Sequence, residues 1–393
     1  MSYRHRLIAS LARLPRGVLG TLVLVCGIET MIAGARDRLA APDQTFARVT
    51  SERLIDWVRD CDWIALGSSQ TKHSIAPREL AIGTGTRGYN LALSGSQAAN
   101  SFFLLRRVLE SGARPRVVIV DFFPVLQRLS HWHVVENDPF LLDIRESLDL
   151  AWSARDPAFF ASIVARRAIP SFRYRQSIRT LVRNRATGSG PSDWSRPTEI
   201  MLRNHLENRG AQVHPPGEIS PDAIARLDRE YFPRWEITAL QDRYIERFLK
   251  LADQAGIRVV WLLTPLHSEL SARIESTGFA AAWTRFVRER GIEHPKLSIV
   301  DARRLEWGER AFLDPNHLAI DGLAAFSSIF APELTRVLAS PDSEPGCWID
   351  LSDRSLTRTE PTTLVDMPAT VRLLRDEYRS VRADRRRGEV LRR

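Results

Sequence analysis

The chain has 393 residues, of which 44% are hydrophobic and 26% charged, which excludes a disordered polymer and allows one large domain or two. The net charge of +9 comes almost entirely from arginine. This composition indicates either a bias in residue usage or affinity for anionic lipid or glycan. No zinc-finger or aromatic-basic RNA motif favours nucleic acid. The three cysteines, Cys26, Cys61 and Cys347, form no CxxC motif, which excludes a disulfide framework and leaves a Cys61–Cys347 bridge as the one pairing to consider.

Residues 17–35 form an apolar segment that contains one charged residue, Glu29, and follows the basic stretch of residues 4–16. This pattern is typical of a signal anchor or a secretory signal, and the segment is nearly long enough to span a membrane. We expect residues 1–40 to be a basic stub and an uncleaved anchor; cleavage near Ala33 or a buried soluble helix are the alternatives. The preceding arginines favour a cytoplasmic N-terminus, although Arg36 and Arg38 weaken this orientation. The sequence predicts a single-pass inner-membrane protein with a periplasmic or extracellular main domain.

Short apolar runs then alternate with amphipathic stretches. Strands are expected at residues 63–66, 88–93, 116–121, 258–264 and 297–301, and helices at 50–60, 97–111, 240–255, 269–290 and 320–338. Residues 116–121 are an unbroken β-branched run, as in a parallel strand that is buried on both faces. The alternation predicts an α/β fold in which residues 50–125 and 240–340 form a doubly wound, mostly parallel, five-stranded sheet.

Two regions depart from the alternation. Residues 126–239 contain a basic helical run, a Gly/Ser/Pro-rich linker and a proline-rich stretch, and we expect a mostly helical insertion or lid over the site. Residues 341–393 form a polar, basic tail that ends in a helix-prone, arginine-rich segment. A solvated surface helix is the simpler interpretation of this segment, and docking to an anionic membrane or polymer is the alternative.

Three polar turns would meet at one edge of this sheet. Gly67-Ser68-Ser69 follows the first strand, Ser94-Gly95-Ser96 the second, and Asp314-Pro315-Asn316-His317 lies beyond the fifth. Ligands bind at the carboxyl ends of the strands in open α/β sheets. A serine nucleophile needs a base for its proton and donors for the developing oxyanion. The sequence therefore predicts Ser69 as nucleophile, His317 as base and Asp314 as the carboxylate that orients it, with the backbone N–H groups of Ser69 and Gly95 as oxyanion donors.

These residues also have structural interpretations. Ser69 could cap the following helix, with Ser68 as the rival nucleophile, and His317 could bond to Asp314 for stability alone. Further candidates for lining the substrate site are Ser68, Asn90, Asp121, His267 and Asn316. His131 and His133 could share one face of a strand, but the sequence offers no third ligand, so no metal and no cofactor are expected.

The three turns resemble blocks of the SGNH, or GDSL-like, hydrolase superfamily, and especially its membrane-anchored branch with the DltD-type and alginate O-acetylation proteins. Gly67-Ser68-Ser69 is similar to the family's Gly-Asp-Ser block, with Ser68 in place of the Asp. Residues 90–95 resemble its glycine block, and Asp314–His317 with Gly322 resembles its Asp-x-x-His block. The resemblance covers residues 60–125 and 255–335. The family's Gly-x-Asn-Asp block is missing, because residues 121–124 are Asp-Phe-Phe-Pro.

This resemblance implies an extracytoplasmic serine esterase or O-acyltransferase that acts on acyl esters of a cell-envelope or secreted polysaccharide without a cofactor. The implied partners are an acylated glycan or acyl donor and a membrane-bound O-acyltransferase. The missing block removes an oxyanion donor, and the loss of one such donor costs about 100- to 1000-fold in rate. The alternative is therefore a catalytically weak or inactive envelope assembly or glycan-binding protein on the same scaffold.

Overall fold

The computed structural model describes residues 16–132, 138–191, 193–231, 235–341, 345–354 and 362–390. Its centre is a six-stranded sheet in which every neighbouring pair is parallel, in the order β2-β1-β3-β4-β5-β8. The strands are β1 (Trp63–Leu66), β2 (Gly88–Asn90), β3 (Val117–Val120), β4 (Arg258–Leu263), β5 (Leu297–Asp301) and β8 (Trp348–Asp350). The predicted α/β class and parallel sheet are confirmed. The predicted count of five strands is wrong, because β8 extends the sheet beyond β5.

Helices cover both faces of the sheet, and the strands alternate between two apolar clusters. In β3, Val118 and Val120 face one cluster, while Val117 and Ile119 face the other. The first cluster includes side chains of α4 (Pro42–Val58), α7 (Ala98–Glu110), α16 (Ala239–Gln254) and α18 (Phe279–Glu293). The second includes side chains of α6 (Pro77–Thr84) and α19 (Ile320–Ala339). Burial on both faces explains why β1 and β3 are continuous apolar runs.

Two predicted helices have different bounds in the structure. The helix expected at 50–60 begins earlier, as α4, where Pro42 occupies the first turn. The helix expected at 269–290 is two helices, α17 (Ser268–Ser276) and α18, which are separated at Gly278. Gly278 has a φ of +76°, a left-handed conformation that ends α17 and reverses the chain before α18.

The region between β3 and β4 is mostly helical, as expected. It contains α8 (Pro124–Arg128), α9 (Asp138–Leu141), α10 (Ile144–Ala154), α11 (Pro157–Ala168), α12 (Pro170–Arg173), α13 (Arg175–Thr187), α14 (Ser195–Glu207) and α15 (Pro221–Tyr231). Its extended segment 209–217 lies against the sheet edge, because Asn90 N–H donates to Arg209 O (3.1 Å) and Gln212 N–H donates to Lys72 O (3.1 Å). The insertion thus reaches the region of the predicted site.

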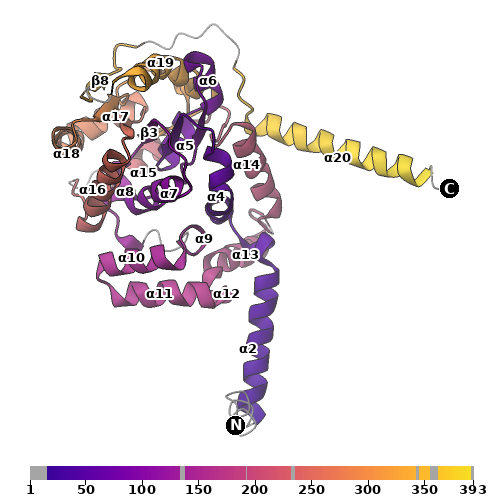
Figure 1. Cartoon of the computed structure of the whole chain (residues 1–393). Coiled ribbons are helices and arrows are strands. Elements are labelled where there is room, and N and C mark those ends of the chain that lie inside the picture. Colours follow the sequence, from indigo (N-terminus) through magenta and orange to yellow (C-terminus); the bar gives the residue numbers. More distant parts are fainter. Residues whose placement is uncertain are drawn as a thin grey trace.

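Helices at the two ends of the chain project from the domain in Figure 1: α2 (Arg16–Gly34) and α20 (Met367–Val390). The 18-residue window Gly17–Gly34 is apolar enough to cross a membrane and is not buried in the domain, which agrees with a single-pass anchor. Before α20, the tail docks on the domain: Thr363 N–H donates to Glu79 (2.7 Å) and Val365 N–H to Asn208 (2.9 Å). Cys61 and Cys347 are free thiols, so the considered bridge is not formed.

Candidate active site

The turn between β1 and α5 (Ser69–Ser74) is built around the buried carboxylate of Asp121, at the end of β3. Asp121 accepts hydrogen bonds from Ser68 N–H (2.6 Å), Ser68 Oγ–H (2.8 Å) and Thr71 N–H (3.0 Å). Gly67 has a φ of +131°, and a Cβ atom there would collide with Asp121 Oδ1. Only glycine allows this approach. Asp121 therefore fixes the turn through these three hydrogen bonds, and contact of its side chain with substrate stays a prediction.

The two serines of the turn have separate roles. Ser68 is the N-cap of α5: it is fully buried, and its hydroxyl accepts from Gln70 N–H (3.1 Å) while it donates to Asp121. Ser69 is the first helical residue, and its Oγ lies 2.9 Å from His317 Nε2. Capping by Ser68 removes the main structural interpretation of Ser69, and it leaves Ser68 without a free hydroxyl for nucleophilic attack or substrate contact.

His317 and Asp314 stand on a short antiparallel hairpin, β6 (Phe312–Asp314) and β7 (His317–Leu318). His317 Nδ1 lies 2.8 and 3.0 Å from the two oxygens of Asp314, so Nδ1–H donates and Nε2 is left to accept the Ser69 proton. Asn316 N–H also donates to Asp314 (3.0 Å). Burial raises the pKa of Asp314, but the hydrogen bond and charge of His317 outweigh it and lower the pKa overall. The carboxylate is therefore ionised and can stabilise a protonated His317.

Contacts from three parts of the chain hold the hairpin. Gly217 N–H donates to Phe312 O (3.1 Å), His267 N–H donates to Pro315 O (2.9 Å), and the His267 ring packs edge-on against Phe312. A Cβ atom on Gly322 would collide with Ala311 O, so glycine lets α19 approach the hairpin closely. The structure thus places His267 and Asn316 at the hairpin, where contact of their side chains with substrate stays a prediction.

The backbone donors proposed for the oxyanion hole are free. Neither Ser69 N–H nor Gly95 N–H donates to an acceptor within the described part of the chain. Gly95 has a φ of +69° in the turn closed by Ser96 N–H and Leu93 O (3.1 Å), with open space around it. These two N–H groups therefore stay available as candidate oxyanion donors.

Asn90 cannot supply the side-chain donor that the missing block would carry. Its Nδ2 donates to Thr71 O (2.9 Å) and Ile75 O (2.8 Å), and its Oδ1 accepts from Ala92 N–H (3.0 Å). The residue is fully buried. The amide ties the end of β2 to α5 and has no free group for substrate, and whether Asn90 lines the substrate site stays a prediction.

Two histidines that the sequence analysis did not select lie beside His317. The His73 ring of α5 is 4.9 Å from the His317 ring and 5.3 Å from that of His214, which comes from the 209–217 segment. Burial is the largest cause that holds the pKa of His73 well below its usual value, and His317 and His214 lower it further. His73 is therefore neutral next to the base. Its position four residues after Ser69 places both on one face of α5, the only sequence signal for it.

Lys72, also on α5, is a buried cation. Its Nζ lies 3.6 Å from the centre of the Phe46 ring and has no hydrogen-bond partner among the described residues. Burial lowers the pKa of Lys72 to about 8, with Asp43 acting in the opposite direction. Nearby, His205 is also buried, and its pKa is lowered to about 3, mainly by burial and then by Lys72. Lys72 therefore lies on the side of α5 that faces α4, and the Phe46 ring of α4 also contacts His205 of α14, with 5.2 Å between the ring centres.

An apolar cavity opens beside the turn, at the carboxyl ends of β3 and β4. Its walls include Phe122, Phe123, Trp261, Leu263, Phe279 and Trp283, and Asp121 and Thr264 also line it. Thr264 Oγ donates to Gln70 Oε1 (2.8 Å), so the cavity lies next to the helix that carries Ser69. The position agrees with the rule that ligands bind at this edge of an open α/β sheet.

The side chains considered for metal binding, where the structure describes them, are engaged in other contacts. His131 Nε2 bonds to Asp156 (3.0 Å), and His133 lies outside the described residues. Glu246, Glu293 and His294 lie close together, but both ring nitrogens of His294 bond to carboxylates, and Lys250 and Arg290 compensate the charge.

No family model matches the chain, and no curated protein is significantly similar to it in sequence. The geometry at Ser69 is therefore the main basis for a functional argument.

Proposed function

We propose that the chain is an SGNH-like serine esterase or O-acyltransferase that works through Ser69, His317 and Asp314. The observation that carries the proposal is the continuous hydrogen-bonded row from Ser69 Oγ through His317 to Asp314, with distances of 2.9 and 2.8 Å. Its members come from two segments 248 positions apart. The sheet order 2-1-3-4-5 of the first five strands is the flavodoxin-like order, in which the crevice lies where the order reverses, between β1 and β3.

The geometry supports acyl transfer in two steps. Ser69 Oγ would attack an ester carbonyl while His317 Nε2 takes its proton, and Asp314 would stabilise the imidazolium. The N–H groups of Ser69 and Gly95 would hold the negative oxygen of the tetrahedral intermediate. Collapse would expel the alcohol, protonated by His317, and leave an acyl group on Ser69. His317 would then deprotonate an acceptor hydroxyl, which attacks the acyl-enzyme and frees Ser69.

The acceptor and the setting are proposed from the resemblance together with α2. A membrane-anchored enzyme of this class would act outside the cytoplasm on acyl esters of a cell-envelope or secreted polysaccharide, with a membrane-bound O-acyltransferase as acyl supplier. The acceptor is then a glycan hydroxyl for transfer or water for hydrolysis.

A second candidate is a weakly active or inactive glycan-binding protein of envelope assembly. Two observations favour it: the chain after β3 is Phe122-Phe123, without the family's asparagine, and the amide of Asn90 is fully committed to backbone groups. An oxyanion hole of two N–H groups would then give a slow enzyme.

Hydrolysis of p-nitrophenyl acetate by the detergent-solubilised full chain separates an enzyme that uses Ser69 from an inactive glycan-binding protein. We expect saturable hydrolysis that Ser69→Ala abolishes. Ser328→Ala, which removes an α19 hydroxyl that donates to Ala324 O, is the matched control and should keep the wild-type rate. Equal rates for wild type and Ser69→Ala would contradict the proposed enzyme.

A further inference from the structure

The outer face of α11 has an unusual composition for a helix in contact with water. Its exposed residues are Pro157, Ala158, Phe160, Ala161, Val164 and Ala168. All of them are apolar, whereas a surface helix normally exposes charged and polar side chains on this face. The charged residues of α11, Arg166 and Arg167, are buried or half-buried instead.

The apolar face continues onto the preceding helix. In α10, Ile144, Leu148 and Trp152 are exposed at four-residue spacing, and Trp152 is 86% exposed. Leu148, Trp152, Pro157 and Phe160 line one groove across the α10–α11 turn. We call the exposed apolar residues of α10 and α11 the α10–α11 patch. A contiguous patch of this kind usually marks a surface that is covered in the working protein.

The patch belongs to a layer that is attached to the apolar N-terminal helix. Ser171, in α12, directs both its N–H (2.8 Å) and its hydroxyl to the carboxylate of Glu29 in α2. Glu29 is the one charged residue of the Gly17–Gly34 span and lies five residues before its end, a rise of about 7.5 Å. In Figure 1, α10, α11 and α12 run across the direction of α2, at the end of α2 that joins the domain.

Unpaired arginines border the same layer. Arg179, Arg183 and Arg185 of α13 are exposed, and so are Arg145 of α10 and Arg155, the residue that follows α10. None of these five makes an ion pair in the part of the chain that the structure describes. Of the carboxylates next to the patch, Asp149 pairs with Arg247, whereas Asp143 and Asp156 cap α10 and α11 and keep their negative charge. The five arginines outnumber these two carboxylates, so the patch is bordered by an excess of positive charge.

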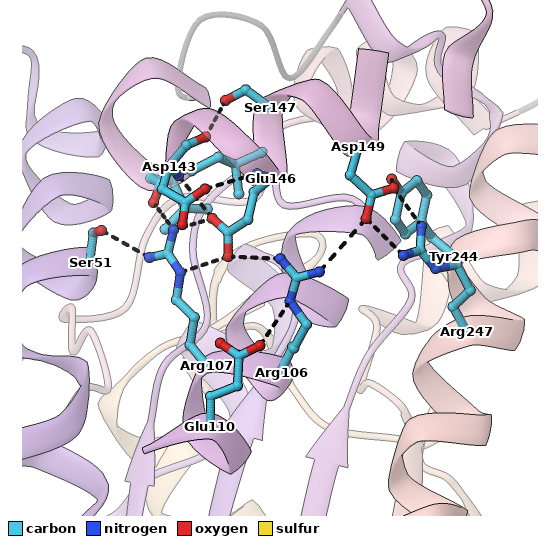
Figure 2. Close-up of polar contacts among 12 residues, drawn as sticks. Ser51, Arg106, Arg107, Glu110, Asp143, Glu146, Ser147, Asp149, Tyr244 and Arg247 are labelled. Atoms are coloured by element: carbon cyan, nitrogen blue, oxygen red, sulfur yellow. Dashed lines mark hydrogen bonds and ion pairs between the residues drawn. The ribbon is translucent and has the colours of Figure 1, made fainter. Parts of the chain in front are cut away.

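The layer is fixed to the catalytic domain by a network of ion pairs, shown in Figure 2. Buried Glu146 of α10 pairs with Arg106 and Arg107 of α7, and Arg107 also donates to Ser51 of α4 (2.9 Å). Asp149 accepts from Tyr244 (3.2 Å) and from Arg247 (2.9 and 2.8 Å) of α16. The patch thus has a defined orientation relative to the domain as well as to α2.

We propose that α10–α12 lie on the surface of an anionic bilayer, with the α10–α11 patch in the headgroup region and the arginines of α10 and α13 at the lipid phosphates. Three features select a bilayer as the occupant: the attachment to α2, the apolar helix face with exposed Trp152, and the unpaired arginines. This is the composition of helices that lie in the plane of a membrane interface. The layer would hold the domain in one orientation above the membrane. The inference does not depend on the enzymatic activity.

Spin labels on the full chain in vesicles test the proposal. Cys26 and Cys347 are replaced by serine, Cys61 is buried and is retained, and single labels are attached after Val164→Cys, Ala161→Cys or Ile292→Cys. Val164 and Ala161 belong to the patch, and Ile292 is an exposed apolar residue of α18 that serves as the matched control. The chain is reconstituted in vesicles of phosphatidylethanolamine and phosphatidylglycerol.

At positions 164 and 161 we expect greater collision with oxygen, which concentrates in lipid, than with a water-soluble nickel chelate. The order should be reversed at position 292. Equal exposure of all three labels to the nickel chelate would overturn the proposal. Protection of the patch labels from both reagents in native membranes, together with full exposure in the vesicles, would also overturn it, because it would indicate a protein partner.

Discussion

Asp121 and Ser68 form a buried pair in which one carboxylate binds both the backbone N–H (2.6 Å) and the hydroxyl (2.8 Å) of the same serine. This pair fixes the strand-to-helix turn, and with it the direction of the neighbouring Ser69. The proposed nucleophile, Ser69, is therefore positioned through hydrogen bonds that its two neighbours in the turn, Ser68 and Thr71, make to Asp121.

Asp121→Asn should change how stability depends on pH. Burial, partly offset by the hydrogen bonds of Ser68 and Thr71, raises the pKa of Asp121 to about 6, above the value of about 3.8 for the unfolded chain. The folded chain therefore binds the carboxyl proton of Asp121 more tightly than the unfolded chain does. The stabilisation that Asp121 gives to the fold is largest below about pH 4 and is lost as the pH rises to about 6. The full loss is on the order of 3 kcal/mol. Urea unfolding in detergent between pH 4 and 7 measures it.

The amide of the Asp121→Asn variant does not titrate, so the stability difference between wild type and variant should shrink as the pH rises through this range. At pH 7 the variant should be less stable by about 1–3 kcal/mol, because its amide NH₂ group would face donors at Ser68 or Thr71, and at pH 4 the difference should be larger by about 3 kcal/mol. A stability difference that stays constant from pH 4 to 7 would show that Asp121 titrates alike in the folded and unfolded chains.

Gly67→Ala should destabilise the fold by more than a left-handed backbone alone explains. The new Cβ atom would meet Asp121 Oδ1 directly, in a backbone region that side chains rarely adopt. Gly112→Ala is the matched control, because Gly112 also has a positive φ (+86°) but has no neighbour within 4 Å of its Cβ position. We expect about 1–2 kcal/mol for the control and a larger loss for Gly67→Ala, measured by denaturant unfolding. Equal losses would mean that the turn has room for a side chain.

Lys72→Met should stabilise the protein at pH 7. The pKa of Lys72 is about 8 in the fold against 10.5 in the unfolded chain, so folding disfavours the charged form. Between about pH 8 and pH 10.5, Lys72 binds a proton in the unfolded chain but not in the folded chain. Raising the pH through this range removes that proton and destabilises the unfolded chain, so the free energy of unfolding of the wild type should rise. Methionine fills a similar volume without charge, and the gain should be about 1–3 kcal/mol at pH 7.

Lys250→Met is the matched control, because Lys250 is exposed on α16 and pairs with Glu246 (3.0 Å). Its effect should stay within about 1 kcal/mol at any pH. Thermal unfolding of both variants at pH 7 and pH 10 checks the difference. If Lys72→Met destabilised the protein at pH 7, the contact of Nζ with the Phe46 ring would outweigh the cost of burying the charge.

Asp314→Asn should leave the fold intact and reduce ester hydrolysis by roughly 10³- to 10⁴-fold, because an amide can hold His317 in the wrong tautomer and cannot stabilise its charge. The exposed Asp353→Asn substitution is a suitable control for the loss of one negative charge. The ratio of kcat to KM on p-nitrophenyl acetate measures the effect. A decrease below tenfold would indicate that the bond from His317 to Asp314 serves stability.

Much of the sheet could be predicted because β1, β3, β4 and β5 are apolar runs that are buried on both faces. In contrast, β8 has only three residues, all partly or fully exposed, at the edge of the sheet, so no periodic pattern identifies it. Helix boundaries are hard to predict where a single residue determines them, as Gly278 does between α17 and α18.

The sequence predicts those parts of the candidate site in which a short separation along the chain already places two side chains close together. Asp314 and His317 are three residues apart on one hairpin, and a serine after a strand is readily recognised. Asp121 was a candidate for the substrate site because it ends a strand, and Asn90 because it begins the segment that resembles the glycine block. Their hydrogen bonds to Ser68, Thr71 and Ala92 depend on tertiary contacts that the sequence does not display. His214 reaches His73 from an irregular segment of the insertion, for which the sequence gives no signal.

Labelling by a fluorophosphonate probe tests the central claim most directly, because the probe reacts only with a serine that a base activates. Detergent-solubilised full chain is labelled, digested and analysed by mass spectrometry, in parallel with His317→Ala. The account predicts one adduct, on Ser69, that His317→Ala abolishes. An adduct on Ser68, equal labelling of wild type and His317→Ala, or no adduct on the folded wild-type chain would contradict it.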